Sequence, residues 1–309
     1  MASKKQIPSS NLPFVAFLSL CAILVVAFST LGANTFNVPV KNLVEKATVQ
    51  EASLAPQIKK DAVEPDLTAK SIYAVDLDSG KVLFSKNPEV PILPASTTKM
   101  ATALVSLETY DLEDIVTIGK VNIDGQKIGL LEGERISVRD LLNGLLVASG
   151  NDTAEVLAAN HPEGRTGFVD QMNELAKTLG LENTHFVNPT GLDEYLHFST
   201  AEDLVKIAGF ALQNPVIAGI VSTQETYTAS LNMKAHKLQN INELVGKVPG
   251  VMGMKTGWTL NSGESVVTYI NRDNKKVMIA LMGSADRFGE TEVLIDWIFN
   301  NYSWGTAVE

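Results

Sequence analysis

The sequence contains very few of the side chains that bind metals or form disulfides. Its 309 residues include one cysteine and four histidines. The single cysteine, Cys21, cannot form an internal disulfide or a thiolate cluster, and no His-Glu-x-x-His spacing occurs. These absences exclude a disulfide-stapled domain and leave no signature of a zinc site. We therefore expect chemistry that uses neither a metal nor an organic cofactor.

Positive charge is also scarce. The 25 Lys and Arg residues against 35 Asp and Glu give a formal net charge of -10 at pH 7, and no basic run interrupts the chain. A protein with this charge has no broad attraction for phosphate backbones, so we expect no nucleic acid partner. Hydrophobic residues make up 45% of the chain and aromatic residues only 6%. This composition is typical of a globular protein with a full-sized core rather than of a disordered chain.

The amino-terminal region lacks charge altogether between Lys5 and Lys41. Within it, residues 14–32 form an apolar stretch whose length is close to the ~20 residues that span a bilayer as a helix, and longer than the roughly 7 to 15 of a signal-peptide core. Lys4 and Lys5 precede it, as the positive-inside rule requires. Residues 27–29 could nevertheless serve as a cleavage site. We expect residues 1–33 to be a membrane anchor or a signal peptide, with the remainder in the extracytoplasmic cell envelope.

Two further regions follow. Residues 34–66 contain Pro39, Pro56 and Pro65 among mixed charges, without a sustained hydrophobic period, and this pattern predicts a linker. Residues 67–309 show no internal repeat and no low-complexity tract, so we expect them to form one catalytic domain.

Both β and helical periodicities occur in the domain. Residues 71–77 and 81–86 predict one hairpin, and residues 264–271 and 276–282 predict another. Apolar residues spaced by three and four predict helices between them. These helices begin near Ser96, at Ser137-x-x-Asp140, near Phe168 and at Ser199-x-x-Glu202, and a final helix contains Trp297. Strands at both ends with helices between predict an α+β fold: an antiparallel sheet flanked by helices, plus a mostly helical lobe.

Three short groups carry side chains that could do chemistry: Ser96-Thr97-Thr98-Lys99, Ser149-Gly150-Asn151 and Lys255-Thr256-Gly257. Each group alone is weak evidence for an active site, because a serine often caps a helix, Ser and Asn are common in turns, and a lysine can simply lie at the end of a strand. Ser96 and Lys99, however, are one turn apart at the start of a predicted helix. Their side chains can therefore share one face, close to the free N–H groups of the helix.

A serine becomes a nucleophile when a neighbouring base takes its proton, and an amine can do this only when it is neutral. Burial and a second cation both lower the pKa of a lysine, and Lys255 would be that cation if the three groups converge. Ser149 could relay a proton from Lys99 to a leaving amine, and Asn151 could hold Lys99 or a substrate amide. We therefore predict that the three groups meet in one cleft.

In this order the three groups resemble those of the penicillin-binding proteins and serine β-lactamases. Longer matches lie at residues 94–100, 138–152, 188–192, 197–201 and 253–257, which include Asn188-Pro189-Thr190-Gly191-Leu192 and Gly253-Met254-Lys255-Thr256-Gly257. With these matches the sequence is most similar to the low-molecular-mass D-alanyl-D-alanine carboxypeptidases, from about Lys70 to Tyr302. The resemblance implies a fold like that of the β-lactamases and DD-peptidases.

The resemblance also implies an acyl-enzyme pathway on peptidoglycan stem peptides that end in D-Ala-D-Ala, with β-lactam antibiotics as covalent inhibitors. Ser96 would attack the penultimate D-alanine carbonyl, Lys99 would act as base, and Ser149 would help to protonate the departing D-alanine. The remaining implied roles concern substrate binding: backbone N–H groups of Ser96 and Trp258 as the oxyanion hole, Lys255 and Thr256 on the terminal carboxylate, and Asn151 and Gly257 beside the substrate.

Other functions remain open. A compact member of the family could instead be a D,D-endopeptidase that cuts peptidoglycan crosslinks. A serine β-lactamase is a weaker alternative, because no Glu-x-x-Leu-Asn is present and Gly150 stands where class A enzymes would have aspartate. A third alternative is a non-catalytic wall-binding or antibiotic-sensing module. A Ser-His-Asp triad has little support, since Gly-x-Ser-x-Gly is absent and His197 has a plausible packing role. Many relatives carry a β-rich domain after the catalytic one, whereas this sequence ends soon after the Trp297 helix, so we expect any membrane attachment through residues 14–32.

Overall fold

A computed structural model of the chain describes residues 55–305. These residues belong to a single compact unit. The apolar stretch at residues 14–32, Cys21 and most of the expected linker lie outside the described residues. The described end of the linker does not run free of the domain: β1 (Gln57–Ile58) pairs with β11 (Tyr302–Ser303).

A five-stranded antiparallel sheet forms the centre of the unit, with strand order β3-β2-β10-β9-β8. The predicted amino-terminal hairpin is β2 (Ser71–Asp76) and β3 (Val82–Lys86). The predicted second hairpin is β9 (Gly263–Arg272) and β10 (Lys275–Ser284), and it turns through Asp273 and Asn274, both with positive φ. β8 (Val251–Thr259) completes the sheet as an edge strand. The predicted fold class is therefore confirmed.

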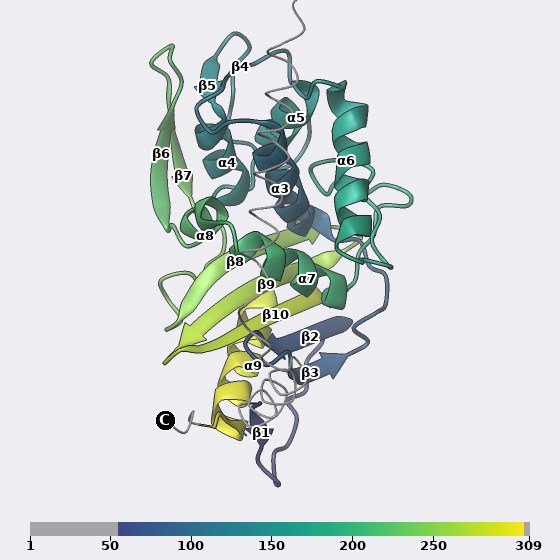
Figure 1. The fold of residues 1–309 in the computed structure, drawn as a ribbon. Helices are drawn as coiled ribbons and strands as arrows, with labels where there is room; N and C mark the ends of the chain where they lie inside the picture. The colour runs from purple at the N-terminus through teal and green to yellow at the C-terminus, as the bar shows by residue number, and fades with distance from the viewer. Residues whose placement is uncertain (1–54, 306–309) are drawn as a thin grey trace, which may run out of the picture. The chain divides into compact units, whose positions relative to one another are not determined.

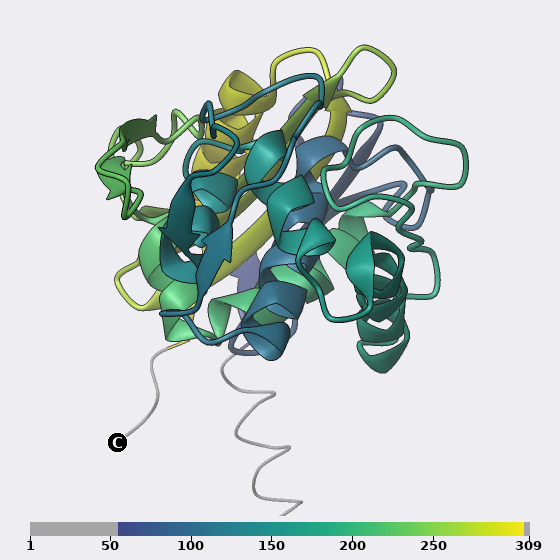
Figure 2. The same ribbon diagram turned by 90° about the horizontal axis from the view of Figure 1, so that it is seen from above.

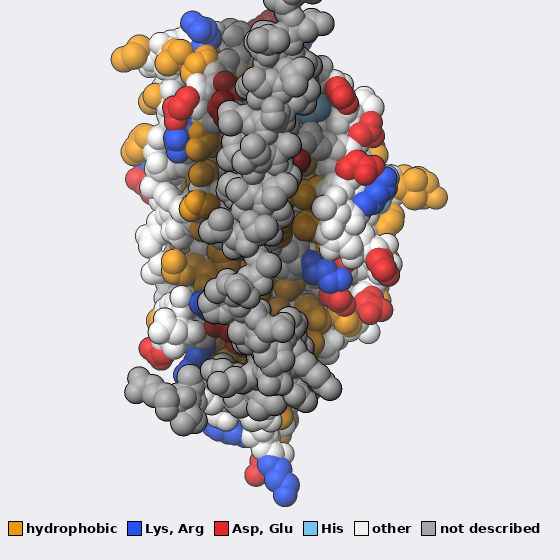
Figure 3. Space-filling view, in the orientation of Figure 1, with side chains coloured by type: hydrophobic (Ala, Val, Ile, Leu, Met, Phe, Trp, Pro, Cys, Tyr) orange, Lys and Arg blue, Asp and Glu red, His pale blue; other side chains and the backbone are white. Residues whose placement is uncertain are grey.

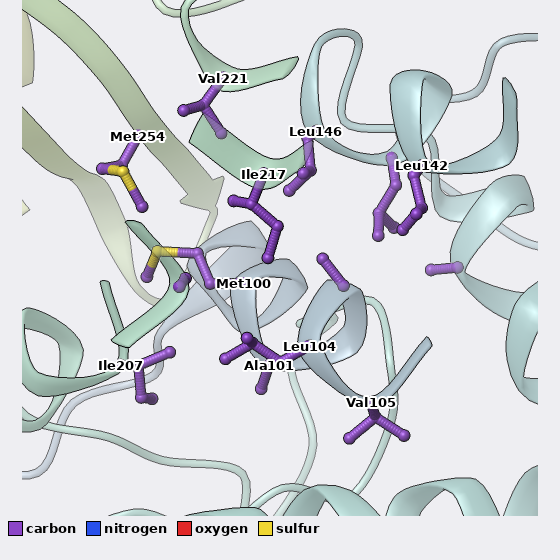
Figure 4. Close-up of a cluster of buried hydrophobic side chains, with 14 of the residues drawn as sticks. Met100, Ala101, Leu104, Val105, Leu142, Leu146, Ile207, Ile217, Val221 and Met254 are labelled. Carbon is purple, nitrogen blue, oxygen red and sulfur yellow. The ribbon is translucent and has the colours of Figure 1, made fainter. Parts of the chain in front are cut away.

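A helical lobe covers one face of this sheet (Figures 1 and 2). Its helices are α3 (Lys99–Thr109), α4 (Val138–Leu146), α5 (Asn151–Ala159), α6 (Gly164–Thr178), α7 (Ala201–Leu212) and α8 (Pro215–Val221). α3 lies in the middle of the lobe, and every residue from Lys99 to Ser106 is buried. Figure 4 shows Met100, Leu104 and their neighbours packed against side chains from α4, α7 and α8. Such burial on all sides fixes the position of the helix that carries Lys99.

The opposite face of the sheet carries a second core under α9 (Arg287–Asn301). Phe84 from β3, Trp297 from α9 and Tyr302 from β11 meet there edge to face, with ring centroids 5.6 and 6.0 Å apart. The Tyr302 hydroxyl donates to the Leu83 carbonyl at 2.7 Å. These contacts hold the last helix against the first hairpin, so the two ends of the described chain are fastened together.

Some elements differ from the expectations. Ser96 lies in a separate 3-10 turn, η1 (Ala95–Thr98), that precedes α3. The cap of α7 is Thr200, which accepts from the Asp203 N–H, rather than the Ser199 and Glu202 pair. Two short hairpins were not predicted, β4 (Ile115–Thr117) with β5 (Arg135–Ser137) and β6 (Glu225–Ala229) with β7 (Ala235–Gln239).

The visible surface mixes both signs of charge. On the face in Figure 3, Lys and Arg side chains are interspersed with Asp and Glu, without a broad basic area outside the grey atoms. Among residues 55–305, no single helix is long and apolar enough to cross a membrane, and the one pair that reaches the required length together, α7 and α8, is bent by 110°.

Candidate active site

The turn that carries Ser96 is held in an unusual backbone conformation. Ala95, directly before the serine, is fully buried and has a φ of 51°, a left-handed conformation that alanine rarely adopts. Gly191, with a φ of 83°, packs directly against this turn, and a Cβ added there would lie 1.8 Å from the Ala95 carbonyl oxygen. Only glycine allows that approach. The 188–192 segment therefore clamps the turn that presents Ser96.

Lys99 places its amine at the centre of the site. Its Nζ lies 2.8 Å from the Ser96 Oγ, 2.7 Å from the Asn151 Oδ1 and 2.7 Å from the Thr190 carbonyl oxygen. The last two atoms can only accept hydrogen bonds, whereas the serine hydroxyl can donate one. A neutral amine has two N–H groups and one lone pair. It satisfies the two acceptors and still directs its lone pair at the Ser96 hydroxyl.

The surroundings favour this neutral form. Lys99 has no exposed surface, and burial lowers its pKa from 10.5 to about 7, while the negative charges of Asp152 and Glu155 act in the opposite direction. A buried ammonium loses its hydration, which is why burial disfavours the charged form. Lys99 can therefore accept a proton near neutral pH.

A second lysine and serine pair faces the first. The Lys255 Nζ donates to the Ser149 Oγ at 2.8 Å and to the Thr256 carbonyl at 3.0 Å. Ser149 has a φ of 58°, again in the left-handed region, at the turn before α5. A buried serine in this conformation is strained, and such strain is common at functional sites. The turn aims the Ser149 hydroxyl across to β8.

The two lysines also repel each other, as expected from the sequence. Burial first, then the charges of Lys99 and Arg287, hold the pKa of Lys255 well below its ordinary value. Repulsion between two charges acts on both partners, so it favours the neutral form of Lys99 as well. Burial is nevertheless the main cause of the lowered pKa of Lys99.

β8 forms one wall of the site. Gly257 lies against the serine turn, because a Cβ there would lie 2.9 Å from the Pro94 carbonyl oxygen and 3.1 Å from the Ser96 nitrogen. Trp258 follows with a side chain that is 60% exposed. The Thr256 hydroxyl is buried and has no hydrogen-bond partner among the described residues. An unsatisfied buried hydroxyl is costly, so a ligand atom is a natural partner for it.

Arg287 is a site residue that the sequence did not indicate. It is the first residue of α9, and its Nη1 donates to the Gly257 carbonyl at 2.9 Å. Its Nε is buried without a partner in the described part of the chain. No motif surrounds it, and only the packing of α9 against the sheet brings it beside β8.

Asn151 and Asp152 hold residues 124–130 beside the site by hydrogen bonds. The Asn151 Nδ2 donates to the Asp124 carbonyl at 2.7 Å, so its amide group is already used on both sides. The Asp152 carboxylate accepts the backbone N–H groups of Ile128, Gly129 and Leu130 at 2.9 to 3.2 Å. Of the two expected roles of Asn151, the geometry shows the hold on Lys99.

His197 lies behind the site rather than in it. Its Nδ1 accepts the Val187 N–H at 3.1 Å, which leaves the proton on Nε2 to be donated to the Thr98 Oγ1 at 2.9 Å. Burial lowers the pKa of His197 to about 4, so the ring is neutral at physiological pH. It links the 185–198 segment to the serine turn. Within residues 55–305, no three His, Cys, Asp or Glu side chains are grouped to hold a metal ion.

A serine beside a neutral buried amine, a second serine and lysine pair opposite, and a wall of antiparallel strand together define an active-site-serine enzyme of acyl transfer. Residues 58–286 match the sequence profile of a family described as D-alanyl-D-alanine carboxypeptidase. The chain belongs to this family, and the resemblance drawn from the sequence is confirmed.

Individual relatives agree with this assignment. The chain is similar to D-alanyl-D-alanine carboxypeptidase DacB2 of Mycobacterium tuberculosis, with 36% identity over 76% of this chain and 84% of that protein. It is also similar to a D-alanyl-D-alanine endopeptidase of Pseudomonas aeruginosa, with 32% identity over 82% of this chain and 84% of that protein. Among solved structures, the Streptomyces K15 DD-transpeptidase matches with a TM-score of 0.73 and 29% identity, over 77% of this chain and 99% of that one.

Proposed function

We propose that this protein, a serine-type D-alanyl-D-alanine carboxypeptidase, removes the terminal D-alanine from peptidoglycan stem peptides through an acyl-enzyme on Ser96. The observation that carries the proposal is the set of three contacts around the Lys99 amine. Two acceptors and one hydroxyl fit a neutral base, and the pKa of about 7 makes that base available.

In the acylation step, the Ser96 Oγ attacks the carbonyl carbon of the penultimate D-alanine while its proton passes to the Lys99 lone pair. The carbonyl oxygen becomes an oxyanion, which the backbone N–H groups of Ser96 and Trp258 would stabilise. The Ser96 N–H lies in the first turn of η1, where amide groups have no partner inside the helix. Loss of one such donor typically costs ~10²-fold or more in rate.

Collapse of this intermediate breaks the bond between the carbonyl carbon and the nitrogen of the terminal D-alanine. The departing amine takes a proton from the Ser149 hydroxyl, which is replenished from the Lys99 ammonium. Water then attacks the ester on Ser96 and gives a proton to Lys99, which is neutral once more. The bond between the carbonyl carbon and the Ser96 Oγ breaks, and Lys99 returns that proton to the Oγ. The products are D-alanine and the shortened peptide, and the enzyme returns to its starting state.

Recognition of the terminal carboxylate explains the positive groups that the reaction itself does not use. The Thr256 hydroxyl has no hydrogen-bond partner within residues 55–305. Near it, Arg287 donates to the Gly257 carbonyl and Lys255 donates to the Ser149 hydroxyl. A carboxylate bound here would satisfy the hydroxyl and offset the cations. The requirement for a free carboxyl end follows from this arrangement.

The test is release of D-alanine from a purified pentapeptide that ends in D-Ala-D-Ala, with Ser96→Ala as the control. We expect release by the wild type and none by the variant. No release by a correctly folded wild type would remove the proposal. Incubation with penicillin separates the β-lactamase alternative: a long-lived adduct on Ser96 supports a carboxypeptidase, whereas rapid and sustained antibiotic turnover supports a lactamase.

The proposal extends to the location of the enzyme. The apolar residues 14–32 behind Lys4 and Lys5 support a domain that works outside the cytoplasm, attached to the membrane by this segment or released after its cleavage. Amino-terminal sequencing of the protein isolated from cell fractions tests this. Recovery of the protein from the cytoplasm alone would contradict it.

A further inference from the structure

A buried histidine and a buried glutamate face each other outside the site described above, between β7 and the segment that joins β4 to β5. His236 on β7 and Glu134 at the end of that segment are each 5% exposed, and the His236 Nε2 lies 2.9 Å from the Glu134 Oε2. The His236 Nδ1 lies 3.2 Å from the carbonyl oxygen of Ile128, in the same segment. The reaction above uses none of these groups.

Both neighbours of the His236 ring are hydrogen-bond acceptors. A carboxylate and a carbonyl oxygen donate nothing, so the ring satisfies both only when each of its nitrogens carries a proton. Such a ring is positively charged, and Glu134 balances that charge in the interior. The Lys234 Nζ, 3.9 Å from the Glu134 Oε1, adds a longer and partly exposed contact. His236 therefore ties β7 to two points of the 118–134 segment.

The 118–134 segment depends on such ties because it has little regular structure of its own. Between the end of β4 and the start of β5 it contains no helix or strand. At its base, the Ile118 N–H donates to the Glu134 carbonyl at 2.8 Å. Its middle is held from two sides, by the Asp152 carboxylate on α5 and by His236 on β7. A connection of this length without secondary structure is commonly functional.

The middle of this segment also holds Asn151 in place beside Lys99. The backbone carbonyls of Asp124 and Gln126 accept the Nδ2–H and the backbone N–H of Asn151, both at 2.7 Å. The Asn151 Oδ1 in turn accepts from the Lys99 Nζ at 2.7 Å. His236 binds the same segment two residues further along the chain. Displacement of the segment would therefore loosen Asn151 and let water replace it on the Lys99 amine.

From these contacts we infer that His236 is a positioning residue for the reaction: it holds the 118–134 segment against Asn151 and so keeps the Lys99 amine dry. The inference rests on the proposed function, because Lys99 is the base in it. It gives His236 no part in making or breaking bonds. Because burial is what lowers the pKa of Lys99 to about 7, access of water should raise that pKa.

The test measures Ser96 acylation by a fluorescent penicillin between pH 5 and 9. His236→Phe keeps a ring but donates no hydrogen bond. The midpoint of its pH profile should rise by about one pH unit, so that acylation at pH 6 falls about tenfold. His161→Phe is the matched control, because both ring nitrogens of His161 are also hydrogen-bonded, but to residues outside the 118–134 segment. A merely structural role would lower the melting temperature in both variants without moving either midpoint.

A double variant, His236→Gln with Glu134→Gln, tests rescue without buried charge. The amide at position 236 can donate to the Ile128 carbonyl and accept from the amide at position 134, so the midpoint should return towards that of the wild type. In His236→Gln alone, the new amide places its oxygen against one of the two acceptors whichever way it turns. Its midpoint should therefore lie above that of the double variant, and this comparison serves if His236→Phe does not fold.

The outcomes separate the inference from the function on which it rests. An unshifted midpoint in folded His236→Phe, an equal shift in His161→Phe, or equal midpoints for His236→Gln and the double variant would overturn the role of His236. Acylation of the wild type in the same experiment would leave the proposed function standing. Absence of Ser96 acylation in the folded wild type would instead remove the function itself.

Discussion

Replacement of Lys99 by arginine tests the proposed base most directly. Arginine keeps the positive charge and a similar length, but its guanidinium stays protonated at any pH at which the protein is folded. If Lys99 acts only as a fixed cation, Lys99→Arg should retain much of the activity. If Lys99 takes the proton of Ser96, the variant should lose acylation almost entirely.

The size of the effect follows from the pKa. At pH 7, a lysine with its ordinary pKa of 10.5 is neutral in about one molecule in 3,000, whereas a pKa of about 7 leaves about half of the molecules neutral. Burial therefore raises the population of the base by about 1,000-fold, which corresponds to about 4 kcal/mol. We expect Lys99→Arg to slow acylation by at least this factor.

The assay is the second-order rate of Ser96 acylation by a fluorescent penicillin between pH 5 and 9. The wild-type rate should rise tenfold per pH unit up to about pH 7 and then level off, because only neutral Lys99 reacts. Asp152→Asn removes a charge that raises the pKa of Lys99, so its profile should bend at a lower pH. Lys81→Arg is the control for the substitution itself. Acylation of Lys99→Arg within tenfold of wild type, or a wild-type rate independent of pH between 5 and 8, would refute the reasoning.

Three more changes have defined outcomes. Because the pKa of Lys99 is about 7 in the folded state and 10.5 when unfolded, the unfolded chain binds more protons between these pH values, and the buried ammonium destabilises the fold most below pH 7. Lys99→Met removes this cost, so it should raise the free energy of unfolding below pH 7 by up to about 5 kcal/mol, at 1.36 kcal/mol per pKa unit. Denaturant titrations should show this gain shrinking as the pH approaches 10.5. Gly191→Ala should lower both the melting temperature and the acylation rate, the latter by about tenfold or more, since its Cβ would collide with the Ala95 carbonyl; unchanged acylation would mean that the clamp is not needed. Arg287→Ala should raise KM for a peptide that ends in D-Ala-D-Ala by about tenfold or more. The same substitution should change KM much less for a peptide whose terminal carboxylate is replaced by an amide.

Much of the site could be predicted because its chemistry is concentrated in short motifs. Ser96 and Lys99 are three residues apart, so local geometry alone brings them together, and the structure joins them at 2.8 Å. The convergence of Ser149 with Lys255 across 106 residues was a stronger prediction, and the 2.8 Å contact confirms it. It rested on the order of three motifs rather than on any one of them.

Other features could not be predicted because backbone atoms or tertiary packing produce them. The third partner of Lys99 is the carbonyl of Thr190, and every residue has a carbonyl, so sequence carries no sign of its role. Arg287 reaches β8 only because α9 packs across the sheet. The hairpin of β6 and β7 has little hydrophobic signal in its sequence, because only Thr228, His236 and Leu238 are buried in it and only one of them is apolar.

The order of the strands has a consequence for how the enzyme is made. β2 lies between β3 and β10 in the sheet. A strand that begins at Ser71 therefore pairs with one that begins at Lys275, and pairings between segments so distant in sequence form slowly. A chain made from its amino end therefore contains Ser96 and Lys99 well before β8 supplies Lys255 and the wall that packs against the serine turn at Gly257. A product truncated before β8 would keep the nucleophile and its base but would lack Lys255 and Thr256, so we expect it to be inactive.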